Sequence, residues 1–387
     1  MEKLSIEDMA TFCKRKGFVY LSGEVYGGLS GFFDFGHLGV ELKNNIKNNW
    51  WKTFVHQRED IVGIDGSIIT HPKVWKASGH VDCFGDVLVE DVKTKARYRA
   101  DHLIEDALNI STEGMNEEQL WNVIQEKKVK SPQGNDLTKP TQFNLLFPVN
   151  VGSVAGHTSY LRGETAQLIF SNFKLVQDNA RMKLPFGIAQ MGKAFRNEIS
   201  PRDFLFRMRE FEQLEIEYFV HSEQGTDCPF IEEVLDYELL VYTEHMQKKN
   251  TKPKKMTISH SLEKKIIKNS WHAYWIVMMH KWFIDLGANP EKFRIRQHVK
   301  DELSHYSTDT WDLEYEFPFG WKELQGFADR GDYDLKQHMQ HAKVDMSMYD
   351  EETKKKIVPH VVCEPSQGVE RAFLVFMFDA YEYDKKR

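Results

Sequence analysis

Cysteine is scarce in this sequence, and no cysteine is paired by spacing with another. Four occur among 387 residues, with no CxxC or CxxH pattern, at Cys13, Cys83, Cys228 and Cys363. A disulfide framework or a structural zinc site needs such clustering. We therefore expect separate, reduced thiols and no zinc.

Long apolar runs and a secretory leader are also missing. No run approaches the roughly 20 apolar residues that span a bilayer. The start, Met1-Glu-Lys-Leu, lacks a basic segment followed by an apolar one. The composition, 41% hydrophobic and 28% charged, is close to that of globular proteins. These features predict a cytoplasmic protein without a membrane partner.

Positive charge is not in excess, since the net charge is −7. This balance disfavours a protein whose whole surface coats nucleic acid, but it leaves a local basic patch open.

A glycine-rich phosphate loop is absent as well. Residues 26–36 are rich in glycine and aromatic residues, but no GK[ST] or GxGxxG completes the pattern, so we interpret them as a packed turn. Next, apolar residues recur every four positions, which predicts an amphipathic helix over residues 38–54. This apolar stripe consists of Leu38, Leu42, Ile46, Trp50 and Phe54.

Two segments are interpreted as insertions. Residues 105–140 are polar and rich in turn-forming residues, which predicts an exposed or partly mobile loop. Residues 222–300 carry a lysine-rich stretch, which predicts a solvated helical face, with contact to an RNA backbone as the alternative. The lysines are Lys248, Lys249, Lys252, Lys254, Lys255, Lys264, Lys265 and Lys268.

Chemistry-bearing side chains gather between residues 189 and 219. Residues 189–200, a polar turn at 201–203 and residues 205–219 predict an antiparallel hairpin. Strand side chains alternate between faces, so one face is predicted to hold Leu214, Ile216 and Tyr218, and the other Arg209, Phe211, Gln213 and Glu215. By the same rule Arg196 and Glu198 share a face. A charged outer sheet face with weak cross-strand ion pairs is the alternative interpretation.

The order of the residues along the chain decides between a site-bearing face and a charged outer sheet face. Arg196-Asn-Glu, a short loop and then FRMREFEQLEIEYF over 206–219 resemble motif 2 of the class II aminoacyl-tRNA synthetases, in the form used by glycyl enzymes. Glu364-Pro-Ser-Gln-Gly-Val-Glu-Arg, where a strand is expected to enter a helix at a glycine, resembles motif 3. Segments within residues 18–51, together with residues 72–80, resemble the N-terminal block and motif 1 of glycyl-tRNA synthetases. Further similar segments lie at 99–102, 140–147, 161–167 and 320–335, so the resemblance covers almost the whole chain.

This resemblance implies a class II catalytic fold of the α/β (α+β) class, with a mainly antiparallel sheet flanked by helices. Residues 1–387 would form one catalytic domain carrying the two insertions. The implied activity joins glycine to ATP as an adenylate and transfers glycine to tRNA(Gly). The implied assembly is a homodimer through the motif 1 helix, of the dimeric eukaryotic or archaeal-like type.

The resemblance also assigns residues to ATP. Arg196 would hold the α-phosphate and Arg371 the γ-phosphate, because a guanidinium binds two oxygens at once and stays charged. Phe211 would stack on adenine, and Glu323, the third residue expected to be catalytic, would bind Mg²⁺. The full expected ATP set is Arg196, Asn197, Glu198, Phe206, Arg207, Met208, Arg209, Glu210, Phe211, Glu323, Leu324, Gly368, Val369, Glu370 and Arg371.

Glycine has no side chain to bind, so its site must hold the ammonium and carboxylate groups and exclude a Cβ atom. By resemblance Glu164, Glu215, Glu364 and Ser366 form an acidic lining, and Arg99 and Arg330 are substrate ligands. The full expected glycine set is Arg99, Glu164, Phe211, Glu212, Gln213, Leu214, Glu215, Arg330, Glu364, Pro365, Ser366, Gln367 and Gly368. His80, His102 and His360 are expected to be structural.

The sequence departs from the family in three places. Gly163 and Leu168 stand where proline and glycine are usual, and residues 87–98 hold no cysteine. The chain also stops shortly after the expected motif 3 helix, so we expect the anticodon-binding domain to be absent and tRNA charging to be weakened. Two rival functions are a catalytically inactive synthetase-like accessory protein and another adenylate-forming ligase with an altered amino-acid pocket.

Overall fold

The structure is a computed structural model, and it describes residues 4–110, 112, 115–153, 156, 158–222, 227–302, 307, 309–351 and 353–382. The account below concerns these residues.

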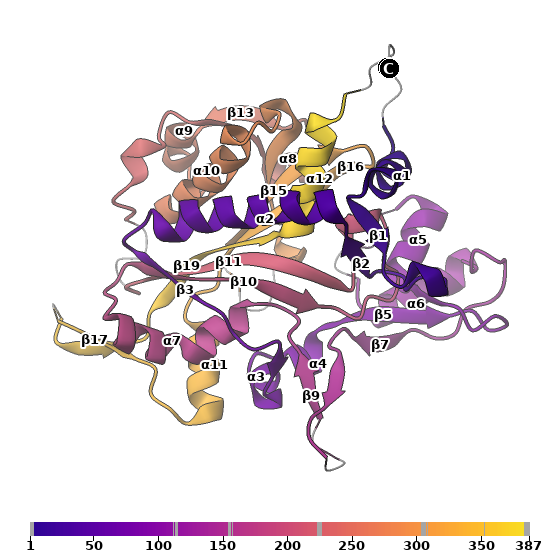
Figure 1. The fold of residues 1–387 in the computed structure, drawn as a ribbon, viewed down its shortest axis with the longest axis horizontal. Helices are drawn as coiled ribbons and strands as arrows, with labels where there is room; N and C mark the ends of the chain where they lie inside the picture. Colours follow the sequence, from indigo (N-terminus) through magenta and orange to yellow (C-terminus); the bar gives the residue numbers. More distant parts are fainter. Residues whose placement is uncertain are drawn as a thin grey trace.

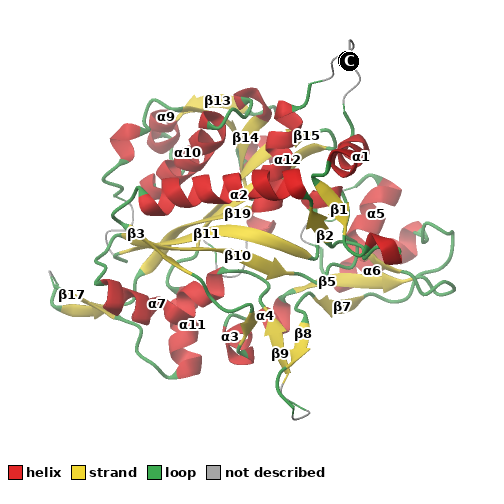
Figure 2. Ribbon diagram, in the orientation of Figure 1, coloured by secondary structure: helices red, strands yellow, loops and turns green. Residues whose placement is uncertain are grey.

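A nine-stranded sheet forms the centre of the molecule (Figures 1 and 2). Neighbouring strands are antiparallel except β12 beside β14 and β10 beside β3. From edge to edge the strands are β13 (Lys254–Thr257), β12 (Glu238–Tyr242), β14 (Phe293–Gln297), β15 (Asp309–Phe317), β16 (Gly320–Asp329), β19 (His360–Gly368), β11 (Glu210–Val220), β10 (Phe186–Phe195) and β3 (Ile61–Ile64). The predicted class, a mainly antiparallel sheet flanked by helices, is confirmed.

Helices cover both faces of this sheet. On one face, apolar side chains of β11 pack in a large core against α1 (Ile6–Lys16), α2 (His37–Trp51), α10 (Ser270–Asp285) and α12 (Val369–Ala380). On the other face, α7 (Ala166–Ala180) and α11 (Tyr333–Ala342) enclose a second core. Figure 1 shows α2 crossing in front of the sheet, with α7 and α11 below it. The active-site strands are therefore held between two apolar layers.

The predicted amphipathic helix corresponds to α2 and the π-helical turn that continues it, Lys52–His56. Ile46, Trp50 and Phe54 are buried as expected, but Leu38 is 44% exposed. The preceding stretch, residues 26–36, is only in part the packed turn that we expected, because Phe33 and Phe35 pack against the large core whereas Tyr26 is 93% exposed. The stretch begins at the end of a 3₁₀ turn (Glu24–Tyr26) and contains β2 (Phe33–Phe35), which pairs with β1 (Val19–Leu21).

Residues 105–140 contain more structure than the expected loop. Helix α6 (Glu117–Lys127) buries Leu120 and Ile124 against α5 (Ala100–Leu108) in a small core of its own. A three-stranded sheet completes this unit, with strands β6 (Arg97–Arg99), β5 (Gly85–Glu90) and β7 (Thr141–Asn144). The high polar content reflects exposed helix and turn surfaces around few buried residues.

Residues 222–300 are built into the main sheet. They supply β12, β13 and β14, and α10, whose apolar side chains lie in the large core. Two short helices, α8 (Glu244–Lys248) and α9 (Ile258–Glu263), complete the region. All eight lysines noted above are exposed, and Lys254 and Lys255 lie on the edge strand β13. Charged residues on an edge strand oppose pairing with another sheet. The lysines are solvated as expected, but they do not form a helical face, because Lys248 alone of the eight lies within a helix.

The remaining elements are short. Helices α3 (Pro72–Ala77) and α4 (His80–Cys83) precede β5, and two further sheets comprise β4 (Ile69–Thr70), β9 (Thr158–Leu161) and β8 (Pro148–Asn150), and β17 (Met348–Asp350) with β18 (Lys355–Ile357). Among the helices that the structure describes, none combines the length and apolar content needed to cross a membrane.

Candidate active site

The predicted hairpin is formed by β10 and β11, which pair antiparallel over their whole length. Leu214, Ile216 and Tyr218 are fully buried in the large core, on one face of β11. Gln213 and Glu215 lie on the other face, where Thr165 at the start of α7 contacts both of them. The predicted alternation is confirmed, because the apolar face is fixed by α2, α10 and α12.

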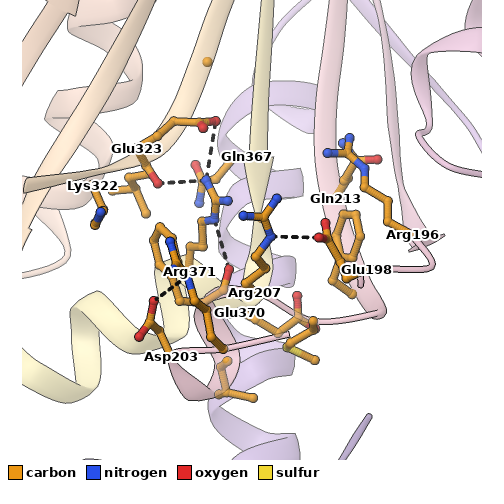
Figure 3. A pocket seen from close by; sticks show the side chains of 18 of the residues that line it. Arg196, Glu198, Asp203, Arg207, Gln213, Lys322, Glu323, Gln367, Glu370 and Arg371 are labelled. Carbon is orange, nitrogen blue, oxygen red and sulfur yellow. Dashed lines mark hydrogen bonds and ion pairs between the residues drawn. The ribbon is translucent and has the colours of Figure 1, made fainter. Parts of the chain in front are cut away.

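The two strands are shorter than expected, and the residues between them form a long connection. Arg196 and Glu198 follow the end of β10, and Arg209 precedes β11. The backbone N–H of Arg196 donates to the carbonyl of Arg209 at 2.9 Å, which closes the base of this connection. Arg207 is ion-paired with Glu198 at 2.8 Å (Figure 3). The connection therefore gathers four arginines, Arg196, Arg202, Arg207 and Arg209, at one end of the hairpin.

Arg196 is available for an anion. Its guanidinium donates to the carbonyl of Gly163 at 3.2 Å and lies 5.3 Å from the Phe84 ring centre and 5.4 Å from that of Phe211. Within the described part of the chain, no carboxylate lies within ion-pair distance of it. Cation–π contacts orient a guanidinium without neutralising its charge, so Arg196 keeps its charge for a ligand.

The junction of β19 and α12 forms the opposite wall. Gly368 precedes the first residue of α12, and Arg371 lies in the first turn. The Arg371 guanidinium lies 4.3 Å from the centre of the Phe206 ring, and it donates to the backbone carbonyl of Glu323 at 2.8 Å. Figure 3 shows Arg371 and Glu323 approaching each other across the pocket. Arg371 and Phe206, which are 165 residues apart in sequence, thus meet at one place.

Gly368 is not required by the backbone conformation. Its φ is −81°, which any residue adopts, and an added Cβ would meet only the Arg371 side chain, at 3.6 Å. No neighbouring protein backbone lies close to Gly368. We therefore expect the close approach that this glycine allows to be made by a ligand in the pocket.

A cavity of about 680 Å³ lies between these walls. Most of the residues expected to contact ATP line it, and several expected to contact glycine do so at one end. The expected residues that line it are Arg99, Arg196, Glu198, Phe206, Arg207, Met208, Phe211, Gln213, Glu323, Leu324, Ser366, Gln367, Gly368, Glu370 and Arg371. Lys322, Arg202 and His102 also line it and were not predicted.

Four residues expected at the ATP site lie elsewhere. Arg209 donates to backbone carbonyls of Glu198 and Ser30, and Glu210 is ion-paired with Lys193. The other two are Asn197, whose backbone N–H bonds to Leu145, and Val369, which is buried in the large core. These four residues hold the backbone that surrounds the pocket and do not line it.

Glu212 and Leu214, expected at the glycine site, lie on the opposite face of β11. Glu212 is ion-paired with Lys43 at 2.9 Å and with Lys47 at 2.5 Å, and Lys43 also pairs with Glu370 at 2.7 Å. We refer to Lys43, Lys47, Glu212 and Glu370 as the helix-side ion cluster. Pro365 shares this orientation on β19, because it alternates with Glu364 and Ser366. The alternation rule alone separates these residues from Glu215 and Glu364.

The remaining acidic residues gather beside the cavity, at its buried end. Glu215 accepts a hydrogen bond from Thr165, and its strand position is directly opposite Ser366. The Glu164 carboxylate accepts from Gln167 at 3.1 Å and is ion-paired with His80 at 3.2 Å. Ser78 contacts the other ring nitrogen of His80 at 2.8 Å. His80 is thus structural, as expected, and it orients an acid of the site.

Arg330 neutralises part of this charge. It is 2% exposed, contacts both Glu364 oxygens at 2.9 and 3.0 Å, and pairs with Asp334 at 2.8 Å. Asp334 in turn accepts from Gln167 at 3.0 Å. These bonds occupy its guanidinium, so Arg330 supports Glu364 in this structure, and its role as a substrate ligand stays a prediction.

The acids have different proton affinities. Burial raises the pKa of Glu364 to about 8, and the charges of Glu215 and Glu164 add to that rise while Arg330 opposes it. Burial, and then the charge of Glu164, also raises the pKa of Glu215. For Glu164, burial is outweighed by His80 and the nearby arginines, so its pKa lies below the usual range. Additional positive charge is therefore favoured at this end of the cavity.

Arg99 forms ion pairs with two neighbouring aspartates. Its guanidinium pairs with Asp86 at 2.7 Å and with Asp101, and it reaches both the main cavity and an adjoining one of about 450 Å³. It lies at the border of the small α5–α6 unit, and the acidic cluster lies at the other end of the cavity.

Glu323 offers one place for Mg²⁺. Its side chain is 51% exposed and lies 3.4 Å from the Arg371 guanidinium. Asp312 on the neighbouring strand is engaged by His298 at 2.8 Å and by Arg296 at 3.2 Å. One accessible carboxylate beside a phosphate-sized cavity fits a cation that binds mainly through phosphate oxygens and water.

Some residues of the site were missed in the sequence. Asp334 lies four residues after Arg330, and Gln167 closes the ETAQ segment. Their positions were visible, but the hydrogen bond from Gln167 to Asp334, at 3.0 Å, requires α7 and α11 to pack side by side.

Comparison with known proteins gives a consistent result. Residues 153–379 match the family described as tRNA synthetase class II core domain (G, H, P, S and T). Glycine–tRNA ligase of Acetivibrio thermocellus is 43% identical over 99% of this chain and 75% of its own length. The enzyme of the same name from Geobacillus thermodenitrificans is 43% identical over 98% and 74%. That of Caldanaerobacter subterraneus is 42% identical over 99% and 76%.

These relatives correct one detail of the expected type. All three are from bacteria, so the assignment to a eukaryotic or archaeal-like type is replaced by a bacterial one.

Proposed function

This chain belongs to the class II tRNA synthetase family, and from that premise we propose that it is a glycine–tRNA ligase: it activates glycine with ATP and transfers it to tRNA(Gly). The observation that carries the proposal is that five arginines and the exposed carboxylate of Glu323 line a single cavity, with a buried acidic cluster beside it. Arginines bind phosphates, the exposed carboxylate can bind a cation, and the acidic cluster can bind the ammonium group of an amino acid.

ATP would occupy the open, arginine-lined part. Arg196 would bind the α-phosphate, and Arg371 the γ-phosphate, with Phe211 beneath the adenine. The position of Arg196 supports this role, because it lies beside Phe211 and has no ion-pair partner among the described residues. Glu323 would hold Mg²⁺ against the phosphates.

Glycine would occupy the acidic end, with its ammonium group toward Glu215 and Glu364. Its carboxylate would then point back to the α-phosphate, past Ser366 and Gln213, which border both parts. Tight packing around Glu215, which is 1% exposed, leaves little room for a larger side chain. Steric exclusion would discriminate against alanine and serine without an editing step.

The reaction requires positioning and charge neutralisation. A glycine carboxylate oxygen attacks the α-phosphorus, the bond to the β-phosphate oxygen breaks, and pyrophosphate leaves with the electron pair. Negative charge on the phosphate oxygens would be stabilised by Arg196 and Arg371. Mg²⁺, when bound, stabilises the charge of the leaving pyrophosphate.

We further propose that two copies associate through α2 and the preceding turn. Apolar side chains in this region are exposed, namely Val25, Tyr26, Leu29, Leu38 and Val40. Exposed apolar surface of this kind marks association sites. ATP, glycine and tRNA meet in the cytoplasm, where we expect the protein to act.

A glycine-dependent ATP–pyrophosphate exchange assay tests the activation step. Exchange with glycine, and little with alanine or serine, is the expected result. Absence of exchange, with retained folding, would favour the inactive accessory function. Exchange driven equally by another amino acid or acid would favour a different adenylate-forming ligase. Charging of tRNA(Gly) by the same preparation tests the transfer step.

A further inference from the structure

Glu217 is a buried carboxylate that the account above does not use. It lies two residues beyond Glu215 on β11, so its side chain is on the same face of the sheet. Its side chain is 0% exposed, and within the described part of the chain neither of its oxygens has a hydrogen-bond partner. A buried, unpaired carboxylate is strongly unfavourable unless a ligand compensates it.

Three carboxylates converge at this point. One oxygen each from Glu215, Glu217 and Glu364 lies within 4.8 Å of the other two. A protonated amine donates three hydrogen bonds of about 2.8 Å in tetrahedral directions, which places their acceptors about 4.6 Å apart. The cluster therefore has the size and the charge to receive an ammonium group.

The existing hydrogen bonds show which acids have acceptor capacity left. Both oxygens of Glu164 are engaged, by Gln167 and by His80. Glu364 is engaged by Arg330, and one oxygen of Glu215 by Thr165. Glu217 alone among these four acids has both oxygens unengaged, so it has the largest unmet demand for a donor.

We propose that Glu217 is a binding residue for the amino group of the substrate, and that it forms a three-carboxylate ammonium site with Glu215 and Glu364. The proposal deepens the proposed function and rests on it. Burial, and then the charge of Glu364, raises the pKa of Glu217 well above its usual range. The free enzyme therefore carries an unfavourable group, which an entering ammonium compensates.

This arrangement predicts opposite effects on stability and binding. Glu217→Gln removes the charge but keeps the shape. Without glycine, its melting temperature should rise by about 2 °C or more, because no charge has to be buried or protonated. With glycine, the KM for glycine in ATP–pyrophosphate exchange should rise at least tenfold, while the KM for ATP stays within twofold. The glycine-induced rise in melting temperature should shrink accordingly.

A ligand comparison separates ammonium binding from a general structural effect. Glycolate carries a hydroxyl group in place of the ammonium group, so it measures binding without the positive charge. The ratio of glycolate to glycine dissociation constants should fall at least tenfold in Glu217→Gln. Glu217→Met serves as a second neutral variant, and Glu238→Gln, at an exposed site on β12, is the matched control.

Each outcome has a definite meaning. An active wild-type enzyme with unchanged glycine KM and unchanged glycolate ratio in both Glu217 variants would overturn this inference and leave the proposed function intact. A wild type that shows neither glycine-dependent exchange nor glycine-induced stabilisation would overturn both. A rise in melting temperature with Mg²⁺ or Mn²⁺ alone, lost in Glu217→Gln, would make the cluster a metal site and overturn the inference.

Discussion

The two ends of the cavity handle charge in opposite ways. At the nucleotide end, Arg196 has no ion-pair partner among the described residues, and Glu323 is half exposed. At the amino-acid end, Glu164, Glu364 and Arg330 are buried and tied to protein partners. A multiply charged ligand suits the first end and a small zwitterion the second. The charged side chains at the nucleotide end are therefore available to a ligand, whereas those at the amino-acid end also stabilise the folded core.

The largest expected effect comes from breaking the buried end. Arg330→Met would leave Glu364 and Asp334 unpaired in the interior, and the free energy of unfolding should fall by about 3–5 kcal/mol. Urea denaturation measures it. A loss below about 1 kcal/mol would show that Arg330 does not support the cluster. Arg196→Ala is the matched arginine deletion at the open end, and its unfolding free energy should stay close to that of the wild type.

Arg196→Ala should instead affect the chemical step. Loss of charge stabilisation at the α-phosphate is expected to lower the exchange rate by about 10²–10³-fold. Exchange kinetics at saturating ATP and glycine, together with an unchanged melting temperature, would confirm the contrast with Arg330. A rate within threefold of the wild type would contradict the assignment.

The pH response should differ between the two ends. Because the pKa of Glu364 is raised to about 8, this carboxyl is protonated below that pH, and an ammonium group must displace its proton. Glycine KM should therefore rise up to tenfold per pH unit as pH falls below about 8. ATP KM should change less between pH 6 and 8. Calorimetry in buffers of different ionisation enthalpy should detect proton release on glycine binding, and a flat glycine KM would contradict the sign.

The smallest expected effect concerns Gly368. Because its φ suits any residue, Gly368→Ala should leave stability unchanged or raise it by about 0.4–1 kcal/mol. The added methyl group would project toward the cavity, so ATP KM should rise severalfold. Thermal melting and ATP titration in the exchange assay check both parts, and a destabilised variant would show that the backbone does require glycine.

Much of this architecture could be predicted from the sequence. The hairpin and the faces of its strands follow from strand alternation, because that rule is local. The entry of β19 into α12 was also predicted correctly, although Gly368, on which that prediction rested, is not required by the backbone there. The ion pairs of Arg330 could not be predicted in the same way. Its partners, Glu364 and Asp334, come from β19 and α11, and their contact depends on how those elements pack.

Burial was the other quantity that the sequence did not reveal. Residues 105–140 have a polar composition, yet Leu120 and Ile124 suffice to anchor a helix there. Likewise Glu217 differs little in pattern from Glu215 and is equally buried, and what distinguishes it is that neither of its oxygens has a hydrogen-bond partner among the described residues. The composition of a segment averages over the buried and exposed faces of its helices and strands. A binding site depends on which of these faces is covered by other elements.

The helix-side ion cluster has a consequence for assembly. Lys43 on α2 pairs with both Glu212 of β11 and Glu370 of α12, Lys47 pairs with Glu212, and Glu370 also accepts from the backbone N–H of Glu212 at 2.9 Å. In the proposed dimer, a second copy that contacts α2 would therefore act on the strand that holds Glu215 and on the turn that holds Arg371. We propose that association of two copies and the order of the active site are coupled, so that dilution lowers the activity.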